Sequence, residues 1–351
     1  MNRKQKLIIA YLGNGKSTNR YHLPYALLRN DKIRVKYIWK HSEKASWKEM
    51  DGIQYTTDID TVLNDPDVQV VVVTAATIAH TELTKKALLA GKHVVCEKPM
   101  ALSYKEAEEC FQIAQERNLV LQAYQNRRFD SDFLTVKSVL ESGRLGDLFE
   151  MEMHFDYYRP EVPQRAKKMS REDSFLYCHA CHTLDQVISL FGKPDSVVYD
   201  VRTILHDGRM NDYFDLDLFY GKRKISIKSS YFRVKPRPSF VAYGTKGMFE
   251  KKDTDRQEFD LKKYYMPTNA DFGLDTPEFY GTLTYMDEKG QYHEEKVPTI
   301  PGSYAFFYDA LYDTIVNGEP PLVTKEQTLL QMYILEQGIQ IMENKNNPLM
   351  C

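Results

Sequence analysis

Two short motifs carry residue types suited to dinucleotide chemistry. Gly13-Asn14-Gly15 directly follows the apolar run Leu7–Leu12, and Glu97-Lys98-Pro99 follows a later apolar run. A Gly-x-Gly turn after a strand lets backbone N–H groups approach a pyrophosphate, because glycine has no Cβ to clash. A lysine after a strand can hydrogen-bond a substrate oxygen and stabilise negative charge as a hydride moves. Together the motifs predict a nicotinamide dinucleotide site with a lysine beside the reactive ring.

The glycine turn continues as Lys16-Ser17-Thr18, and Thr18 stands where the full dinucleotide fingerprint has its third glycine. This substitution predicts a slightly wider approach of helix to strand. Gly15-Lys16-Ser17 is also the tail of a phosphate-binding P-loop, whose first glycine would fall at Ala10. Because Ala10 lies inside the strand pattern, too little chain remains for such a loop. We therefore favour the dinucleotide interpretation over the P-loop and over a plain strand–helix turn.

Cofactor choice should depend on the end of the second strand, where NAD enzymes place an acid on the adenosine ribose. Here Ile33–Trp39 is followed by Lys40 and His41, with no acid before Glu43. A cationic pair suits a 2′-phosphate, so NADP is favoured over NAD, although both side chains can equally be solvated loop residues. Glu97 either orients its own turn or contacts a cofactor ribose. The remaining expected cofactor contacts are Thr74, Ala75, Ala76, His80, Lys98 and Asn126.

These residues must be positioned by alternating strands and helices. The predicted strands are Leu7–Leu12, Ile33–Trp39, Val68–Thr74, His93–Cys96 and Leu119–Ala123. The predicted helices are Ile78–Ala90 and Tyr104–Arg117, and Ser103 with Glu106 forms a capping box before the second. Short strands alternating with helices predict right-handed crossovers and a doubly wound parallel sheet. Residues 1–126 are therefore interpreted as a Rossmann domain.

The pattern of apolar and polar residues changes in residues 127–351, which are interpreted as a second, substrate-binding and oligomerisation domain. One helix pattern runs to Ser142, and two helices, Tyr304–Val316 and Lys325–Met342, close the chain. Between them lie longer alternating stretches: Glu150–Tyr158, Asp195–Thr203, Asp215–Phe219 and Lys224–Phe232. Such alternation predicts an α/β domain with a large, mostly antiparallel open sheet that has one covered face.

Charge and cysteine content limit the classes of partner. Lys plus Arg total 47 against 49 for Asp plus Glu, so no strong single-sign field favours nucleic acid or a membrane surface. The longest apolar stretch, Val70–Ala79, is well short of the ~20 residues that span a bilayer. The apolar run behind the basic start Met1–Lys6 is too short for a signal-peptide core. Five cysteines form no disulfide framework. These features predict a cytoplasmic protein.

Cys178-His179-Ala180-Cys181-His182 is the most ambiguous motif. It reads as a Cys-x-x-Cys-His haem attachment sequence or as a set of zinc ligands. Haem attachment fits poorly with a chain that lacks an export signal. On a regular helix Cys178, Cys181 and Asp185 would share one face, and such ligands would need help from elsewhere to hold zinc. No bound metal is expected.

Taken in this order, the motifs resemble the Gfo/Idh/MocA family, named after glucose-fructose oxidoreductase and inositol dehydrogenase. The resemblance covers nearly the whole chain and includes Glu97-Lys98-Pro99, the junction segment Asn126–Phe129, and His182 with Asp185. It implies a Rossmann domain followed by an α/β domain with an open sheet. It also implies NAD(P)-dependent oxidation or reduction of sugars, polyols and related small molecules by a homodimer or homotetramer.

The resemblance also implies roles for residues. Lys98 would contact the substrate oxygen, and His182 would act as general base, although a core histidine is the alternative; imidazole titrates near neutrality. Dehydrogenases of the family carry an Asp four residues before that histidine, where this chain has Cys178, and a thiol lacks the charge of a carboxylate. A catalytically silent cofactor or sugar sensor and an NAD-dependent glycosidase therefore stay open. Expected substrate contacts are Lys98, Arg127, Tyr157, Arg159, Cys178, His179 and His182.

Overall fold

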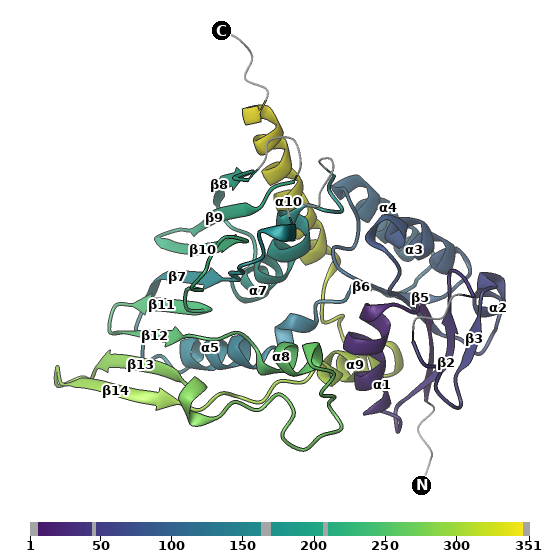
Figure 1. Cartoon of the computed structure of the whole chain (residues 1–351), viewed down its shortest axis with the longest axis horizontal. Helices are drawn as coiled ribbons and strands as arrows, with labels where there is room; N and C mark the ends of the chain where they lie inside the picture. The colour runs from purple at the N-terminus through teal and green to yellow at the C-terminus, as the bar shows by residue number, and fades with distance from the viewer. Residues whose placement is uncertain (1–5, 44–46, 163–169, 206–209, 347–351) are drawn as a thin grey trace. The chain divides into compact units, whose positions relative to one another are not determined.

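The computed structural model describes residues 6–43, 47–162, 170–205 and 210–346, and its contacts divide the chain into two compact units (Figure 1). The first unit comprises Met1–Phe129, Asp260–Phe272 and Ser303–Met332, and the second comprises Asp130–Phe259, Gly273–Gly302 and Tyr333–Cys351. The basic residues 1–5 lie outside the described part of the chain. The division into domains 1–126 and 127–351 stays a prediction.

The first unit is built on a six-stranded parallel sheet with the order β3-β2-β1-β4-β5-β6. Its strands are β1 (Leu7–Leu12), β2 (Ile33–Trp39), β3 (Gln54–Thr56), β4 (Val70–Val73), β5 (His93–Cys96) and β6 (Leu121–Ala123). All four residues of β4 are buried, as expected of a strand covered on both faces. The strand order reverses between β1 and β4, which creates a topological switch point at their carboxyl ends. The predicted doubly wound parallel sheet is confirmed.

The helices of the first unit follow the predicted alternation, with local differences. They are η1 (Ser17–His22), α1 (Leu23–Leu27), α2 (Ile59–Leu63), η2 (Thr77–Ala79), α3 (His80–Leu89), α4 (Tyr104–Glu116), η3 (Asn126–Phe129), α9 (Ala305–Tyr312) and η6 (Asp313–Asn317). Helix η1 is a π-helix, and the single helix predicted over Tyr304–Val316 is divided into α9 and the π-helix η6. At α4, Ser103 accepts the Glu106 N–H, but the Glu106 carboxylate accepts from Leu102 rather than closing the predicted capping box.

The second unit carries an eight-stranded sheet with the order β14-β13-β12-β11-β7-β10-β9-β8. The strands are β7 (Leu148–His154), β8 (Ser196–Arg202), β9 (Tyr213–Tyr220), β10 (Arg223–Ser230), β11 (Phe240–Gly244), β12 (Gly247–Lys251), β13 (Gly281–Met286) and β14 (Tyr292–Val297). Only the β7–β10 pair is parallel among these described strands, which confirms the mostly antiparallel sheet. On β9, Phe214, Leu216 and Leu218 are buried, whereas the alternate Asp215 and Asp217 are half-buried.

Helices α5 (Ser131–Glu141), η4 (Leu176–Ala180, a π-helix) and α7 (Cys181–Phe191) pack on the second sheet. The short η5 (Pro277–Phe279) also belongs to this unit, whereas α8 (Arg256–Lys262) and the last described helix, α10 (Lys325–Asn346), each contain residues of both units. Helix α5 packs against β12 and α7 against β10 (Figure 1). Across the described ranges, no helix is both long enough and apolar enough to cross a bilayer.

Candidate functional site

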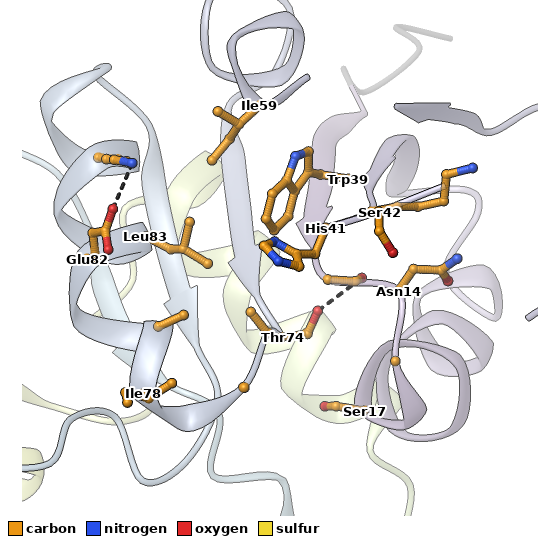
Figure 2. A pocket seen from close by; sticks show the side chains of 17 residues that line it. Asn14, Ser17, Trp39, His41, Ser42, Ile59, Thr74, Ile78, Glu82 and Leu83 are labelled. Carbon is orange, nitrogen blue, oxygen red and sulfur yellow. Dashed lines mark hydrogen bonds and ion pairs between the residues drawn. The ribbon is translucent and has the colours of Figure 1, made fainter. Parts of the chain in front are cut away.

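A pocket of about 870 Å³ opens beyond the carboxyl ends of β1, β2 and β4, at the switch point of the parallel sheet. Figure 2 shows Asn14 and Ser17 on one wall and Ile78 and Leu83 on the opposite wall. Ligands of open α/β sheets bind at this location, and the volume is that of a small-molecule or cofactor site. The predicted cofactor residues that line it are Gly13, Asn14, Gly15, Ser17, Lys40, His41, Thr74, Ala75 and Ala76.

Positions 13 and 15 of the turn are occupied by glycine for different structural reasons. Gly13 has a φ of +138°, and a Cβ there would lie 2.8 Å from the backbone N of Ala75 and from the Thr74 carbonyl carbon. Protein packing therefore requires glycine at this position. A Cβ on Gly15 would meet no atom within 4 Å, although Gly15 lines the pocket. The space beside Gly15 is open to a ligand, which fits a backbone that receives a pyrophosphate.

Thr18, which replaces the third glycine of the fingerprint, is part of the same turn. Its hydroxyl donates to the Gly13 carbonyl at 2.6 Å and lies 2.7 Å from the Thr74 hydroxyl. The side chain is fully buried behind the pocket wall. Instead of only adding bulk between helix and strand, Thr18 ties the glycine turn to the residue that follows β4.

The end of the pocket at Lys40 and His41, where the sequence predicts the ribose, carries acidic as well as basic side chains. Lys40 Nζ lies 2.9 Å from Glu49 and 3.4 Å from Glu43, and the hydrogen bond to Glu49 raises the pKa of Lys40. The His41 ring meets Trp39 edge-on, with ring centroids 5.9 Å apart. The predicted cationic pair therefore lines the pocket, but two acids offset part of its charge.

The Glu-Lys-Pro turn begins where β5 ends, and its glutamate is buried. Glu97 accepts a hydrogen bond from the Lys98 N–H at 2.9 Å, lies 3.1 Å from Nε2 of His22, and accepts from the Ser17 hydroxyl. Burial acts to raise the pKa of Glu97, but the hydrogen bond from His22, the charge of Lys98 and the Ser17 hydroxyl lower it to about 2. Lys98 itself is half-buried, and the Lys98-Pro99 peptide bond is cis.

Other predicted cofactor residues lie behind the pocket or beside it. Nδ1 of His80 is 2.9 Å from the Pro99 carbonyl, and Nε2 is 3.1 Å from that of Ala75, so this buried ring bridges two turns; burial lowers its pKa. Asn126 is buried in η3, as is Arg127, which was predicted as a substrate contact. Within the described part of the chain, the pocket lining omits Lys16, Thr18, His80, Glu97, Lys98 and Asn126.

In the second unit, three predicted substrate residues gather around a tyrosine that sequence reasoning missed. Nε2 of His179 is 3.0 Å from the Tyr231 hydroxyl. The Tyr157 ring centroid is 5.1 Å from that of His179, and the Arg159 guanidinium lies 4.7 Å from the Tyr157 ring. Burial raises the pKa of Tyr231, which keeps its hydroxyl neutral at ordinary pH. No motif marks Tyr231, because it lies in the ordinary alternating stretch predicted over Lys224–Phe232.

The Cys/His segment does not form the regular helix face that its spacing predicted. A π-helical turn precedes α7, so Cys178 lies in η4 while Cys181 and Asp185 lie in α7. Cys178 Sγ donates to the Glu172 carbonyl at 3.3 Å, and Cys181 Sγ donates to the Cys178 carbonyl at 3.6 Å. His182 is buried. Among residues that the structure describes, no three His, Cys, Asp or Glu side chains are arranged to hold a metal ion.

Two family models match successive ranges of the chain. Residues 7–125 match the family model described as "Oxidoreductase family, NAD-binding Rossmann fold", and residues 137–350 match "Oxidoreductase family, C-terminal alpha/beta domain". The chain is 42% identical over 333 residues to the uncharacterized oxidoreductase YhhX of Escherichia coli, covering 94% of this chain and 95% of that protein.

Two further relatives span similar lengths. The chain is 31% identical over 341 residues to scyllo-inositol 2-dehydrogenase (NADP(+)) IolW of Bacillus subtilis, covering 96% of this chain and 94% of that protein. A crystal structure of an oxidoreductase from Bacillus cereus is 43% identical with a TM-score of 0.90, covering 95% of this chain and 96% of that one. With its parallel nucleotide-binding sheet and matched second domain, the chain belongs to the Gfo/Idh/MocA family of oxidoreductases.

Proposed function

We propose that this oxidoreductase transfers a hydride between a nicotinamide cofactor and a hydroxyl-bearing carbon of a sugar, polyol or related small molecule. The observation that carries the proposal is the pocket at the β1/β4 switch point. The space beside Gly15 is open there, and the hydroxyl of Ser17, which lines the pocket, donates a hydrogen bond to Glu97 of the Glu-Lys-Pro turn. A nicotinamide bound there would supply or accept the hydride.

The half-buried Lys98 is our candidate for the group at the substrate oxygen. Its ammonium would donate a hydrogen bond to that oxygen and stabilise the negative charge that develops on it. A buried, ionised Glu97 beside the Lys98 N–H gives the turn a fixed backbone anchor. In the oxidation direction the carbon loses a hydride to the cofactor and the hydroxyl loses a proton to a base.

His182 in the second unit is our candidate for that base. Imidazole suits the task because its unperturbed pKa lies near neutrality. Cys178 occupies the position of the family's assisting Asp, and its thiol donates to the Glu172 carbonyl, so we assign it shape rather than charge. Proton transfer would then rest on His182 without a carboxylate partner at position 178.

The cofactor proposal favours NADP(H). Lys40 and His41 both line the pocket, and the relative from Bacillus subtilis is named for NADP(+). The same name makes inositols the first substrates to test. Donor groups for a polyol are available in the second-unit cluster of Tyr157, Arg159, His179 and Tyr231.

We further propose a cytoplasmic homodimer or homotetramer. Light scattering on the purified protein would test the oligomeric state.

The function itself is tested by incubating NAD⁺, NADP⁺ and their reduced forms with inositols, sugars and keto-sugars while the absorbance of reduced nicotinamide is followed. Net turnover supports the proposal. Cofactor binding without turnover indicates a silent sensor, and release of an aglycone without net cofactor change indicates a glycosidase.

A further inference from the structure

Behind the Glu-Lys-Pro turn, four buried side chains of the first unit form one continuous hydrogen-bonded chain. The hydroxyls of Tyr11 and Tyr308 are 2.9 Å apart, and the Tyr308 hydroxyl is 2.8 Å from Nδ1 of His22. Nε2 of His22 lies 3.1 Å from Oε1 of Glu97. Tyr11, His22 and Tyr308 are each no more than 1% exposed. These hydrogen-bonded side chains therefore lie inside the fold and not at the pocket surface.

The direction of these hydrogen bonds follows from the carboxylate at one end. An ionised Glu97 can only accept, so Nε2 of His22 must carry a hydrogen. Nε2 donates to Glu97 in the neutral and in the protonated ring alike. Nδ1 accepts from the Tyr308 hydroxyl in the neutral ring, with the Tyr308 oxygen accepting from Tyr11, and donates to the Tyr308 oxygen in the protonated ring. Burial raises the pKa of both tyrosines, so both hydroxyls stay protonated and able to donate.

Aromatic packing holds the His22 ring in addition to its hydrogen bonds. The Tyr124 ring stacks on it, with centroids 3.7 Å apart and planes at 28°, and the Tyr124 hydroxyl donates to the Tyr21 carbonyl at 2.7 Å. Tyr11 meets the same ring edge-on at 5.8 Å. A ring held on its face and its edge presents Nε2 to Glu97 in a single orientation.

Glu97 carries this constraint to the turn that holds the catalytic lysine. Its Oε2 accepts the Lys98 N–H at 2.9 Å, and its Oε1 also accepts from the hydroxyl of Ser17, which lines the cofactor pocket. We propose that His22 is a positioning residue for Lys98: by orienting Glu97, it fixes the Lys98 backbone and ties that backbone to the pocket wall at Ser17. This inference rests on the proposed hydride transfer and deepens it.

Loss of the imidazole should change how Glu97 titrates. Burial alone would raise the pKa of this carboxyl, and the hydrogen bond from His22 is the largest of the effects that oppose burial. Without it, the pKa of Glu97 should rise toward the range in which enzymes are assayed. The other titratable groups that face Glu97 are Lys98, His80, Cys96, Tyr124 and Tyr308.

The first test compares His22→Leu, which removes both ring nitrogens, with His22→Gln, whose amide can still donate to Glu97. We expect kcat of His22→Leu to fall about tenfold to a hundredfold, as for a slightly misplaced catalytic group, while cofactor Kd stays near the parental value. Its pH–rate profile should gain an acid limb as Glu97 becomes protonated. His22→Gln should recover most of kcat and the parental profile.

Amide hydrogen exchange at Lys98 is a second readout, and it requires no turnover. We expect faster exchange of the Lys98 N–H in His22→Leu and parental exchange in His22→Gln. Tyr308→Phe, which removes only the Nδ1 partner, should give a smaller change in the same direction. The control is Tyr312→Phe. Tyr312 is a buried tyrosine of the same helix, α9, that is not one of the four hydrogen-bonded residues, so its substitution should leave the exchange unchanged.

The outcomes separate this inference from the proposed function. A folded His22→Leu protein with parental kcat, pH profile and Lys98 exchange would overturn the role of His22. If that variant does not fold, parental Lys98 exchange in Tyr308→Phe overturns it instead. If the parent binds cofactor but converts no substrate of the panel, the proposed function fails, while the exchange measurements still decide whether His22 positions the Lys98 backbone.

Discussion

The nucleotide-binding unit has a buried carboxylate at its Glu-Lys-Pro end and ion pairs with exposed acids at its Lys40 end. At the Glu-Lys-Pro turn, Glu97 is buried and accepts hydrogen bonds from three donors in the fold. At the Lys40 end, the Lys40 side chain is 11% exposed and meets Glu43 and Glu49, whose side chains are 78% and 50% exposed. Exposed ion pairs contribute little to stability and are screened by salt, whereas removing one member of a buried network leaves its partner uncompensated. The first end is therefore suited to fixed chemistry, and the second to a cofactor preference that single substitutions can alter.

The largest effects should come from the groups proposed to perform the chemistry. General acid–base groups typically contribute ~10²–10⁴ in rate, so Lys98→Ala and His182→Ala should each lower kcat by about that factor while cofactor affinity stays nearly unchanged. Steady-state kinetics and fluorescence titration with NADPH measure the two quantities. Lys105→Ala, an exposed lysine on the nearby helix α4, is the control. Parental kcat in either of the first two variants would remove that residue from the mechanism.

The next largest effect should be on cofactor binding at the glycine turn. Gly15→Val adds a branched side chain where the protein leaves open space, so the fold should be kept while affinity for NADPH falls by about tenfold to a hundredfold. Gly15→Ala should cause a smaller loss. Gly13→Ala is the contrasting variant, because its Cβ would meet backbone at 2.8 Å and its φ is positive, so it should lower the thermal unfolding midpoint. Equal NADPH affinity in the parent and Gly15→Val would contradict the proposed pyrophosphate position.

Cofactor preference should shift more modestly, at the exposed end. Lys40→Asp replaces the cation beside Glu43 and Glu49 with a third acid, which should repel a 2′-phosphate and favour ribose hydroxyls. We expect the ratio of NADP(H) to NAD(H) affinity to fall about fivefold to thirtyfold, because Lys40→Asp changes two charges and each is worth on the order of 0.5–1 kcal/mol at a partly exposed site. Titration of both cofactors at two salt concentrations measures it. A parent that binds NAD(H) at least tenfold more tightly than NADP(H) would show that the interpretation of the second strand is wrong.

The same two ends show what the sequence could and could not predict. Strands β1, β2 and β5 begin and end at the predicted residues. Strands β1 and β5 are largely apolar runs, whereas β2 alternates apolar residues with Arg34 and Lys36, and all three are bounded by polar or glycine residues. Strand β3 was missed because it has three residues and no buried member. The His22 network was also missed, because residues 22, 97 and 308 meet only after folding and share no local pattern. In the sequence Glu43 is the first acid after Lys40, but the ion pair of Lys40 with Glu49, nine residues along the chain, was not predicted.

The smallest effect should be at Cys178, where the family's carboxylate is missing. The thiol donates to the Glu172 carbonyl at 3.3 Å, and a serine hydroxyl can make the same bond, so Cys178→Ser should change kcat by only a few-fold. Cys178→Asp adds a carboxylate one helical turn before His182, and we expect faster oxidation of polyols if proton transfer is limited by the unassisted imidazole. Steady-state kinetics on an inositol panel compares the three proteins. If Cys178→Ser loses as much activity as His182→Ala while remaining folded, the thiol takes part in the chemistry and its assignment to shape alone is wrong.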